Sequence, residues 1–228
     1  MIVALLTAGG VGSRMNQEIP KQFMMLKGKP LIAHTLEVFQ RAPLIDEVCV
    51  VCLADWIHEM REIVNQYGFS KVRLIVPGGR NGQESIFNGL KELRKRCDDD
   101  DIIVIHDGNR PLLSMKVLAG CIATVKAKGN AITSIPVVEA ILITENGEDS
   151  VESIDRKFLR RTQTPHGFIF KDIYEAHLEA KGKGVEDTIA SCTLFQALGR
   201  KVYFCDGEER NLKITTPEDI EQFLFHHS

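Results

Sequence analysis

Residues 2–15 are IVALLTAGGVGSRM, and this stretch decides the fold. Its first half, residues 2–7, is a short continuous apolar run, which is typical of a strand buried on both faces of a parallel sheet. Glycines follow directly at Gly9, Gly10 and Gly12, so the strand ends in a turn whose backbone amides can approach a ligand closely. The stretch therefore predicts a buried strand that leads into a glycine-rich, anion-binding turn.

Strand and helix patterns alternate along most of the chain. The predicted strands cover residues 2–7, 47–53, 72–76, 101–107, 131–136 and 201–205. The predicted helices cover residues 30–42, 55–67, 84–96, 115–128, 171–181 and 187–198. This βαβα alternation predicts an α/β fold with a mostly parallel sheet and helices on both of its faces.

The alternation breaks between residues 137 and 165. Residues 137–156 contain two short apolar segments around Asn146-Gly147, which is a hairpin signal. A projecting hairpin needs cover for its apolar side, and a second copy of the chain is the commonest cover. We therefore expect one domain over residues 1–228, with residues 137–156 as the dimerisation arm of a homodimer. The alternative is an edge hairpin that folds back on its own domain.

The composition is that of an ordinary globular protein. Of 228 residues, 44% are hydrophobic and 26% charged, which excludes disordered and collagen-like chains. The net charge of −3 argues against the class of proteins that bind duplex nucleic acid through its phosphates. No apolar run approaches the roughly 20 residues of a membrane span, and the first residues lack the positive charge of a signal peptide. We expect no nucleic acid partner, no membrane association and a cytoplasmic location.

Cys49 and Cys52 have the CxxC spacing of redox and zinc sites. They fall in a predicted strand, where positions i and i+3 point to opposite faces. No second CxxC or paired histidine accompanies them, so the sequence does not favour a metal or redox site here.

The glycine-rich turn lacks the spacing of two familiar phosphate-binding motifs. A GxGxxG fingerprint that starts at Gly10 would need a glycine at Met15, and no GK[ST] of a Walker loop follows. Two cations follow the turn instead, Arg14 and the Lys21 of PKQF. Backbone amides beside two cations suit a triphosphate that undergoes phosphoryl or nucleotidyl transfer. The alternative is a tight turn flanked by surface cations.

The pattern AGGxGxRM followed by PKQF resembles the nucleotidyltransferases that make nucleoside-diphospho sugars and alcohols. PKQF is similar to one branch, the cytidylyltransferases of 2-C-methyl-D-erythritol 4-phosphate and their relatives that use ribitol 5-phosphate. The resemblance recurs at four motifs, in family order, over nearly the whole chain. It implies a Rossmann-like nucleotide-diphospho-sugar transferase fold, a homodimer, and Mg²⁺ or another divalent cation as cofactor.

The resemblance also implies roles for individual residues. It assigns catalytic roles to Arg14, Lys21 and Lys213. It assigns nucleotide binding to Ala8, Gly9, Gly10, Gly12, Gly79, Ser85 and Asp107. Gly79 and Ser85 belong to GGRNGQES at residues 78–85, which is similar to the GGxxRxxS loop that recognises cytosine. Gly82 stands where that loop usually has arginine, so either Arg80 substitutes for this arginine or its contact is absent. The alternative for the whole segment is a plain glycine-rich turn without a role in cytosine recognition.

The motif IHDGNRPL places Asp107 at the carboxyl end of a strand, where ligands bind in open α/β sheets. It is similar to the family's HDxxRP, which implies that Asp107 lies near the metal and between the two substrates, and that Arg110 binds substrate. Gly108-Asn109 departs from the small pair typical of the methylerythritol enzymes. The alternative is an aspartate that caps a helix and an arginine with a structural role. His106 points to the opposite face of the strand and is predicted to be a core residue.

Two late motifs, IDRKFLRRTQTP and NLKITTP, concern the acceptor. Arg156 matches the arginine that family members place across the dimer interface on the acceptor phosphate; the alternative is a solvated basic face. Thr164 matches a substrate-binding threonine and Lys213 a lysine at the active-site rim. Ala140 stands where a threonine normally contacts the acceptor phosphate, and His166 replaces a glutamine.

The sequence therefore predicts a homodimeric cytidylyltransferase that converts CTP and a polyol phosphate into a CDP-polyol and pyrophosphate. The acceptor phosphate is already an anionic nucleophile, because the second pKa of a monoester is about 6, so no general base is required. We expect the acceptor to be methylerythritol phosphate, an isoprenoid precursor, which the late motifs favour although Gly108-Asn109 and Ala140 depart from the pattern of enzymes that use it. The ribitol 5-phosphate of surface-polysaccharide synthesis is the alternative acceptor. A sugar-1-phosphate nucleotidyltransferase and a non-catalytic nucleotide-binding module are the alternatives.

Overall fold

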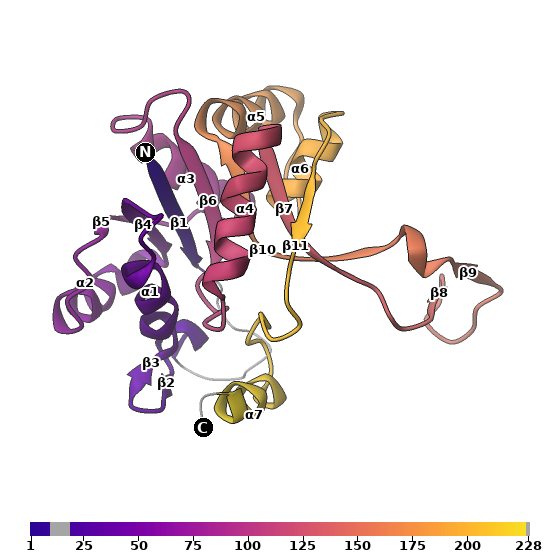
Figure 1. The fold of residues 1–228 in the computed structure, drawn as a ribbon, viewed down its shortest axis with the longest axis horizontal. Helices are drawn as coiled ribbons and strands as arrows, with labels where there is room; N and C mark the ends of the chain where they lie inside the picture. The colour runs from indigo at the N-terminus through magenta and orange to yellow at the C-terminus, as the bar shows by residue number, and fades with distance from the viewer. Residues whose placement is uncertain (10–18, 227–228) are drawn as a thin grey trace.

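The computed structural model describes residues 1–9 and 19–226, and a seven-stranded sheet lies at its centre (Figure 1). The sheet order is β11-β7-β10-β6-β1-β4-β5. Its strands are β1 (Ile2–Ala8), β4 (Glu47–Cys52), β5 (Val72–Pro77), β6 (Ile102–Asp107), β7 (Asn130–Pro136), β10 (Arg160–Ile169) and β11 (Phe204–Asp206). β6, β1, β4 and β5 are parallel to one another, and β11 is parallel to β7. The predicted α/β fold is confirmed.

Helices cover both faces of this sheet. They are α1 (Leu31–Arg41), α2 (Ile57–Gln66), α3 (Gly82–Leu93), α4 (Met115–Lys128), α5 (Phe170–Lys183), α6 (Ser191–Ala197) and α7 (Pro217–His226). Ala4 and Leu6 of β1 pack in the layer of α1, α2 and α4, while Val3 and Leu5 pack in the layer of α3, α5 and α6. Both faces of β1 are buried, which is why its sequence is apolar without alternation. In the described part of the chain, no helix combines the length and apolar character that crossing a membrane requires.

Cys49 and Cys52 lie on opposite faces of β4, as the strand pattern predicts. Cys49 packs in the layer of α3, and Cys52 in the layer of α1 and α2. Burial raises the pKa of the Cys49 thiol to about 12. Two thiols on opposite faces of one strand cannot bind the same metal ion.

The sequence analysis did not predict β10, which lies between β6 and β7 and runs antiparallel to both. Its first three residues, 160–162, are exposed and polar, and only the later part of the strand is buried. The strand therefore lacks a continuous apolar run. Its pairing partners on both sides, rather than its local pattern, make it a strand.

Helix α6 begins four residues later than the predicted helix at 187–198. Gln83 at the start of α3 explains this, because its Oε1 accepts hydrogen bonds from the amide and the hydroxyl of Thr188, both at 2.9 Å. These bonds hold residues 187–190 as a loop beside α3. This loop forms part of the wall of the cavity described below.

The predicted hairpin is confirmed as a separate two-stranded sheet of β8 (Ile141–Ile143) and β9 (Glu152–Ile154). It projects away from the body of the molecule (Figure 1). Gly147 in its turn has a φ of 78°, a conformation that favours glycine. Leu142 and Phe158 are 63% and 79% exposed, so nothing in the described chain covers them. The hairpin's role as a dimerisation arm stays a prediction.

Candidate active site

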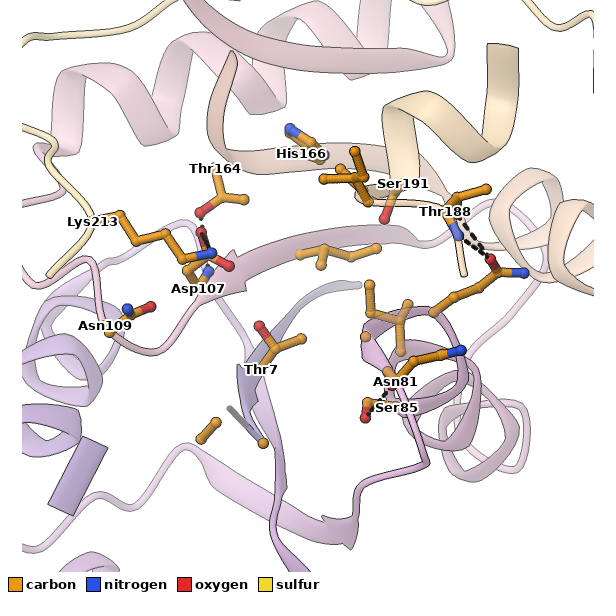
Figure 2. A pocket seen from close by; sticks show the side chains of 18 of the residues that line it. Thr7, Asn81, Ser85, Asp107, Asn109, Thr164, His166, Thr188, Ser191 and Lys213 are labelled. Carbon is orange, nitrogen blue, oxygen red and sulfur yellow. Dashed lines mark hydrogen bonds and ion pairs between the residues drawn. The ribbon is translucent and has the colours of Figure 1, made fainter. Parts of the chain in front are cut away.

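A cavity of about 590 Å³ opens at the carboxyl ends of the parallel strands (Figure 2). It lies where the position of Asp107 at the end of β6 predicts a ligand site. It brings together the predicted site residues Ala8, Gly9, Lys21, Gly79, Ser85, Asp107, Arg110, Thr164 and Lys213. The predicted residues Gly10, Gly12 and Arg14 lie outside the described residues.

Asp107 ends β6, and two cations bracket its carboxylate. The Nε of Arg110 donates to Oδ2 at 2.9 Å, and the Nζ of Lys213 lies 3.2 Å from the same oxygen. Burial alone would raise the pKa of Asp107, but Lys213 and Arg110 together hold that pKa well below its usual range. One carboxylate against two cations leaves a net positive charge. These three side chains, the Asp107 cluster, are therefore suited to an anion such as a phosphate.

Asp107 does not cap the next helix, which was the alternative interpretation of this motif. Ser114 is the N-cap of α4, because its hydroxyl accepts a hydrogen bond from the amide of Val117 at 3.2 Å. The carboxylate of Asp107 instead faces the cavity among the side chains of Figure 2.

The loop that carries Lys213 is anchored on both sides of that lysine. The side-chain amide of Asn109 donates to the carbonyl of Ile214 at 2.6 Å, and Ile214 donates back from its own amide to Asn109 at 2.9 Å. Arg110 donates to the carbonyl of the fully buried Asn211 at 2.7 Å. The sequence analysis missed these anchors. They hold Lys213 over the cavity although its side chain is 43% exposed.

Gly108 and Asn109, which depart from the family pattern, both have structural reasons. A Cβ on Gly108 would lie 2.7 Å from the Cδ1 of Ile32 and 3.0 Å from the carbonyl oxygen of Thr7, so no larger residue fits without a shift. Asn109 fastens the Lys213 loop as described. The pair therefore shapes the site beside the Asp107 cluster.

Thr164 on β10 holds the end of β6 in place. Its Oγ1 accepts a hydrogen bond from the backbone amide of Asp107 at 3.0 Å. The carbonyl of Thr164 accepts from the side chain of Asn211 at 2.8 Å, which ties the Lys213 loop to the same strand. The predicted substrate residue Thr164 therefore lies on the cavity wall, with a hydroxyl proton still to donate.

Lys21 enters the cavity wall from the short helix η1 (Lys21–Phe23). The buried Gln22 donates from Nε2 to the carbonyl of Ala8 at 2.7 Å. The ring of Phe23 stacks on Trp56 with 4.6 Å between centroids. Gln22 thus fixes PKQF to the end of β1 and Phe23 packs it on Trp56, and these contacts position Lys21.

Ser85 shapes the glycine-rich loop before α3. Its hydroxyl donates to the carbonyl of Asn81 at 2.8 Å and accepts from the amide of Gly79 at 2.9 Å. Asn81 caps α3 by accepting from the amide of Glu84. A Cβ on Gly79 would lie 2.4 Å from the Cγ of Glu84, so a larger residue there would displace the side chain of Glu84. Cytosine recognition by this loop stays a prediction.

Arg80 lies on the rim of the cavity, two residues before Gly82. Its Nε donates to Glu84 at 2.9 Å, and its side chain is 80% exposed. The structure therefore gives Arg80, in the loop before α3, a partner in the first turn of that helix.

Arg156 is not brought together with the other predicted site residues. It lies in η3 (Arg156–Phe158) at the base of the arm and donates to the carbonyl of Val138. It does not line the cavity of its own chain. A role for Arg156 at an acceptor phosphate therefore requires the cavity of another chain.

Asp107 is the single carboxylate among the described residues that line the cavity. The described ranges also contain no group of three or more His, Cys, Asp and Glu side chains that could hold a metal ion. Mg²⁺ is commonly bound by one or two carboxylates together with substrate phosphates and water. A divalent cation in this cavity would therefore take most of its ligands from nucleotide phosphates and water, and Asp107 is the carboxylate that could contribute one.

The model of the 2-C-methyl-D-erythritol 4-phosphate cytidylyltransferase family matches residues 2–225. The chain belongs to this family. The ribitol-5-phosphate cytidylyltransferase of Lacticaseibacillus paracasei is 42% identical to it over 225 residues, 98% of this chain and 96% of the relative. The 2-C-methyl-D-erythritol 4-phosphate cytidylyltransferase of Geobacter metallireducens is 40% identical over 223 residues, 96% of this chain and 94% of the relative.

Solved structures agree with this assignment. The 4-diphosphocytidyl-2C-methyl-D-erythritol synthase of Anaerococcus prevotii superposes with a TM-score of 0.82 at 26% identity, over 100% of this chain and 96% of that chain. The chain is thus a cytidylyltransferase that acts on a polyol phosphate, which confirms the predicted enzyme class. The names of its relatives divide between two acceptors.

Proposed function

We propose that this cytidylyltransferase transfers CMP from CTP to ribitol 5-phosphate, with release of pyrophosphate. The observation that carries the proposal is that cations from different elements line one cavity, Lys21 from η1 and the Asp107 cluster at the end of β6. The first suits the triphosphate of CTP and the second the monoester of the acceptor. Two phosphate sites in one cavity support a transfer between two phosphorylated substrates.

Ribitol 5-phosphate is proposed ahead of methylerythritol phosphate for two reasons. The relative that shares 42% of its residues with this chain bears the ribitol name. Gly108-Asn109 and Ala140 also depart from the pattern of the methylerythritol enzymes. Methylerythritol phosphate is the second candidate, because the Geobacter metallireducens relative with that name is 40% identical to this chain.

In the proposed reaction, an oxygen of the acceptor phosphate attacks the α-phosphorus of CTP. A new phosphorus–oxygen bond forms while the bond to the β-phosphate oxygen breaks, and pyrophosphate leaves with the electron pair. The acceptor is already an anion at neutral pH, so no side chain has to remove a proton. Lys21, together with Arg14, neutralises the charge that grows on the α-phosphate and on the leaving group.

The Asp107 cluster orients the acceptor in this mechanism. Ionised Asp107 holds the ammonium of Lys213 and the guanidinium of Arg110 beside the same carboxylate oxygen, so both cations are positioned before the acceptor phosphate binds. A bound Mg²⁺, held by Asp107 and the phosphates, would add charge neutralisation. Catalysis then consists of positioning and electrostatic stabilisation.

The arm supports a homodimer with a shared site. Val138, Leu142 and Phe158 are exposed apolar side chains on or beside the hairpin, and burying them against a second copy would stabilise the pair. Arg156 lies at the base of the same arm, away from its own cavity. We propose that Arg156 of each chain binds the acceptor phosphate in the cavity of the other.

The test is pyrophosphate release from each of the four ribonucleoside triphosphates with a panel of acceptors. The panel contains ribitol 5-phosphate, methylerythritol phosphate and a sugar 1-phosphate. We expect the highest kcat/KM for CTP with ribitol 5-phosphate. A higher value with methylerythritol phosphate would reverse the choice of acceptor but leave the reaction intact. CTP binding without pyrophosphate release from any pair would favour a non-catalytic nucleotide-binding module.

A further inference from the structure

One part of the cavity wall has hydrogen-bonding capacity that the proposed reaction does not yet use. His166, His177 and Ser191 line the cavity, and each is only 3% exposed. Within residues 1–9 and 19–226, no partner exists for Nε2 of either histidine or for Oγ of Ser191. Buried polar atoms without a partner cost free energy, and most such atoms in native proteins are hydrogen-bonded. This wall is therefore suited to the uncharged polar part of a ligand.

His166 is the member of this group that lies beside the Asp107 cluster. Both it and Thr164, two residues earlier on β10, line the cavity, and His166 pairs with Ile105 of β6. Figure 2 shows His166 between Thr164 and Ser191. A ligand held by its phosphate at the Asp107 cluster can extend past Thr164 to His166.

The unpartnered ring nitrogen of His166 is a hydrogen-bond acceptor. Burial lowers the pKa of His166 to about 4, so the imidazole is neutral at pH 7. The carbonyl of Gln163 accepts a hydrogen bond from the ring, and this bond must use Nδ1–H because Nε2 has no partner. Nε2 then carries a lone pair. A phosphate dianion has no proton to donate to Nε2, whereas a polyol hydroxyl can donate one.

We propose that His166 is a specificity-determining residue whose Nε2 accepts a hydrogen bond from a hydroxyl of the acceptor polyol. The proposal rests on the proposed function, which places the acceptor phosphate at the Asp107 cluster. The polyol then lies along β10, and the nucleotide lies against the loops of Gly9 and Ser85. An acceptor that lacks this hydroxyl leaves Nε2 buried and unpaired, so the site selects acceptors by their hydroxyl pattern.

The experiment combines two variants with acceptors that each lack one hydroxyl. His166→Leu removes the acceptor atom, and His166→Gln retains an acceptor oxygen. With CTP and ribitol 5-phosphate, or its deoxy analogues, pyrophosphate release gives KM and kcat/KM. We expect the unmodified enzyme to lose about three- to tenfold in kcat/KM for one deoxy analogue. His166→Leu should raise KM for the complete acceptor by a similar factor and no longer distinguish that analogue, whereas His166→Gln should retain most of the discrimination.

His34→Gln is the matched control, because His34 is buried, its Nε2 lies 2.8 Å from the carbonyl of Leu26, and it does not line the cavity. His106 is not suitable as the control, because its Nε2 lies 3.0 Å from the carbonyl of Arg110, but it is fully buried and packs against Phe39. This confirms the prediction that His106 is a core residue. The control should leave KM for both substrates unchanged.

Two results would overturn the role of His166. One is a rise in KM for CTP, rather than for the acceptor, in His166→Leu. The other is that the unmodified enzyme uses every deoxy analogue as well as the parent, a measurement that needs no variant and therefore holds even if His166→Leu folds poorly. Failure of the proposed function would look different, because the unmodified enzyme would then release no pyrophosphate with any polyol phosphate.

Discussion

Replacing Lys213 by methionine removes one cation of the Asp107 cluster and keeps an unbranched side chain. Nζ of Lys213 lies 3.2 Å from Asp107, and the lysine side chain is 43% exposed. The carboxylate of Asp107 is only 18% exposed, but it keeps its bond to Arg110 in this variant, so the free energy of unfolding should fall by only about 1 kcal/mol. A charge-assisted hydrogen bond from Nζ to the acceptor phosphate contributes roughly 1.5–3 kcal/mol. Its loss should raise KM for the acceptor by roughly ten- to a hundredfold.

The assay for Lys213→Met is pyrophosphate release at varied acceptor and saturating CTP, combined with urea unfolding followed by circular dichroism. Lys171→Met is the control, because Lys171 is 53% exposed, lies 4.0 Å from its carboxylate partners and does not line the cavity. The control should behave like the unmodified enzyme. An unchanged KM for the acceptor in Lys213→Met, or an equal rise in KM for CTP, would refute the assignment of Lys213 to the acceptor phosphate.

Four further predictions follow from the site, the arm and the buried histidines. Lys21→Ala should lower kcat by about 10²–10³ and weaken CTP binding far less, as measured by kinetics and calorimetry, because its charge acts on the transition state. Arg156→Ala should raise KM for the acceptor alone by roughly ten- to a hundredfold, and mixing this chain with Lys21→Ala should restore activity, since one site of the heterodimer recovers both residues. Ile141→Asp should yield monomer or aggregate in light scattering and abolish turnover while CTP binding remains; an active monomer would exclude the shared site. Burial lowers the pKa of His177 to about 4, so the unfolded chain binds a proton at higher pH than the folded chain. As the pH is lowered from about 6.5 to 4, His177 should therefore decrease the free energy of unfolding by about 1.4 kcal/mol per pH unit, as measured by urea unfolding. The His177→Gln variant should lack this contribution to the pH dependence.

The central sheet was predictable because a strand buried on both faces has a continuous apolar sequence. Every residue of β1 from Val3 to Leu6 faces an apolar layer, so the strand is a continuous apolar run. β10 has no continuous apolar run, because its exposed first residues are charged and its burial depends on β6 and β7 on either side. The hairpin of the arm was predictable from Asn146-Gly147, since a turn of this kind is a local property of the chain.

For the site, the sequence by itself determined which residues come together at one edge of the sheet. Gly9, Gly79 and Asp107 each follow or end a strand of the parallel part, and the carboxyl ends of parallel strands meet at the same edge. The sequence pattern also identified the cations Lys21 and Lys213, although Arg156 stays outside the cavity of its own chain.

Only the tertiary structure decided how these residues are held. Asn109 bonds to Ile214 across 105 positions of sequence, and the side chain of Asn211 bonds to Thr164 across 47. An asparagine that anchors a distant loop has the same local pattern as one in an ordinary turn, because its partner is chosen by packing. The unpaired Nε2 of His166 is likewise a product of burial between β10 and its neighbours. Local periodicity records which face of a strand is buried, but the partner of a buried polar atom exists only once distant segments have met.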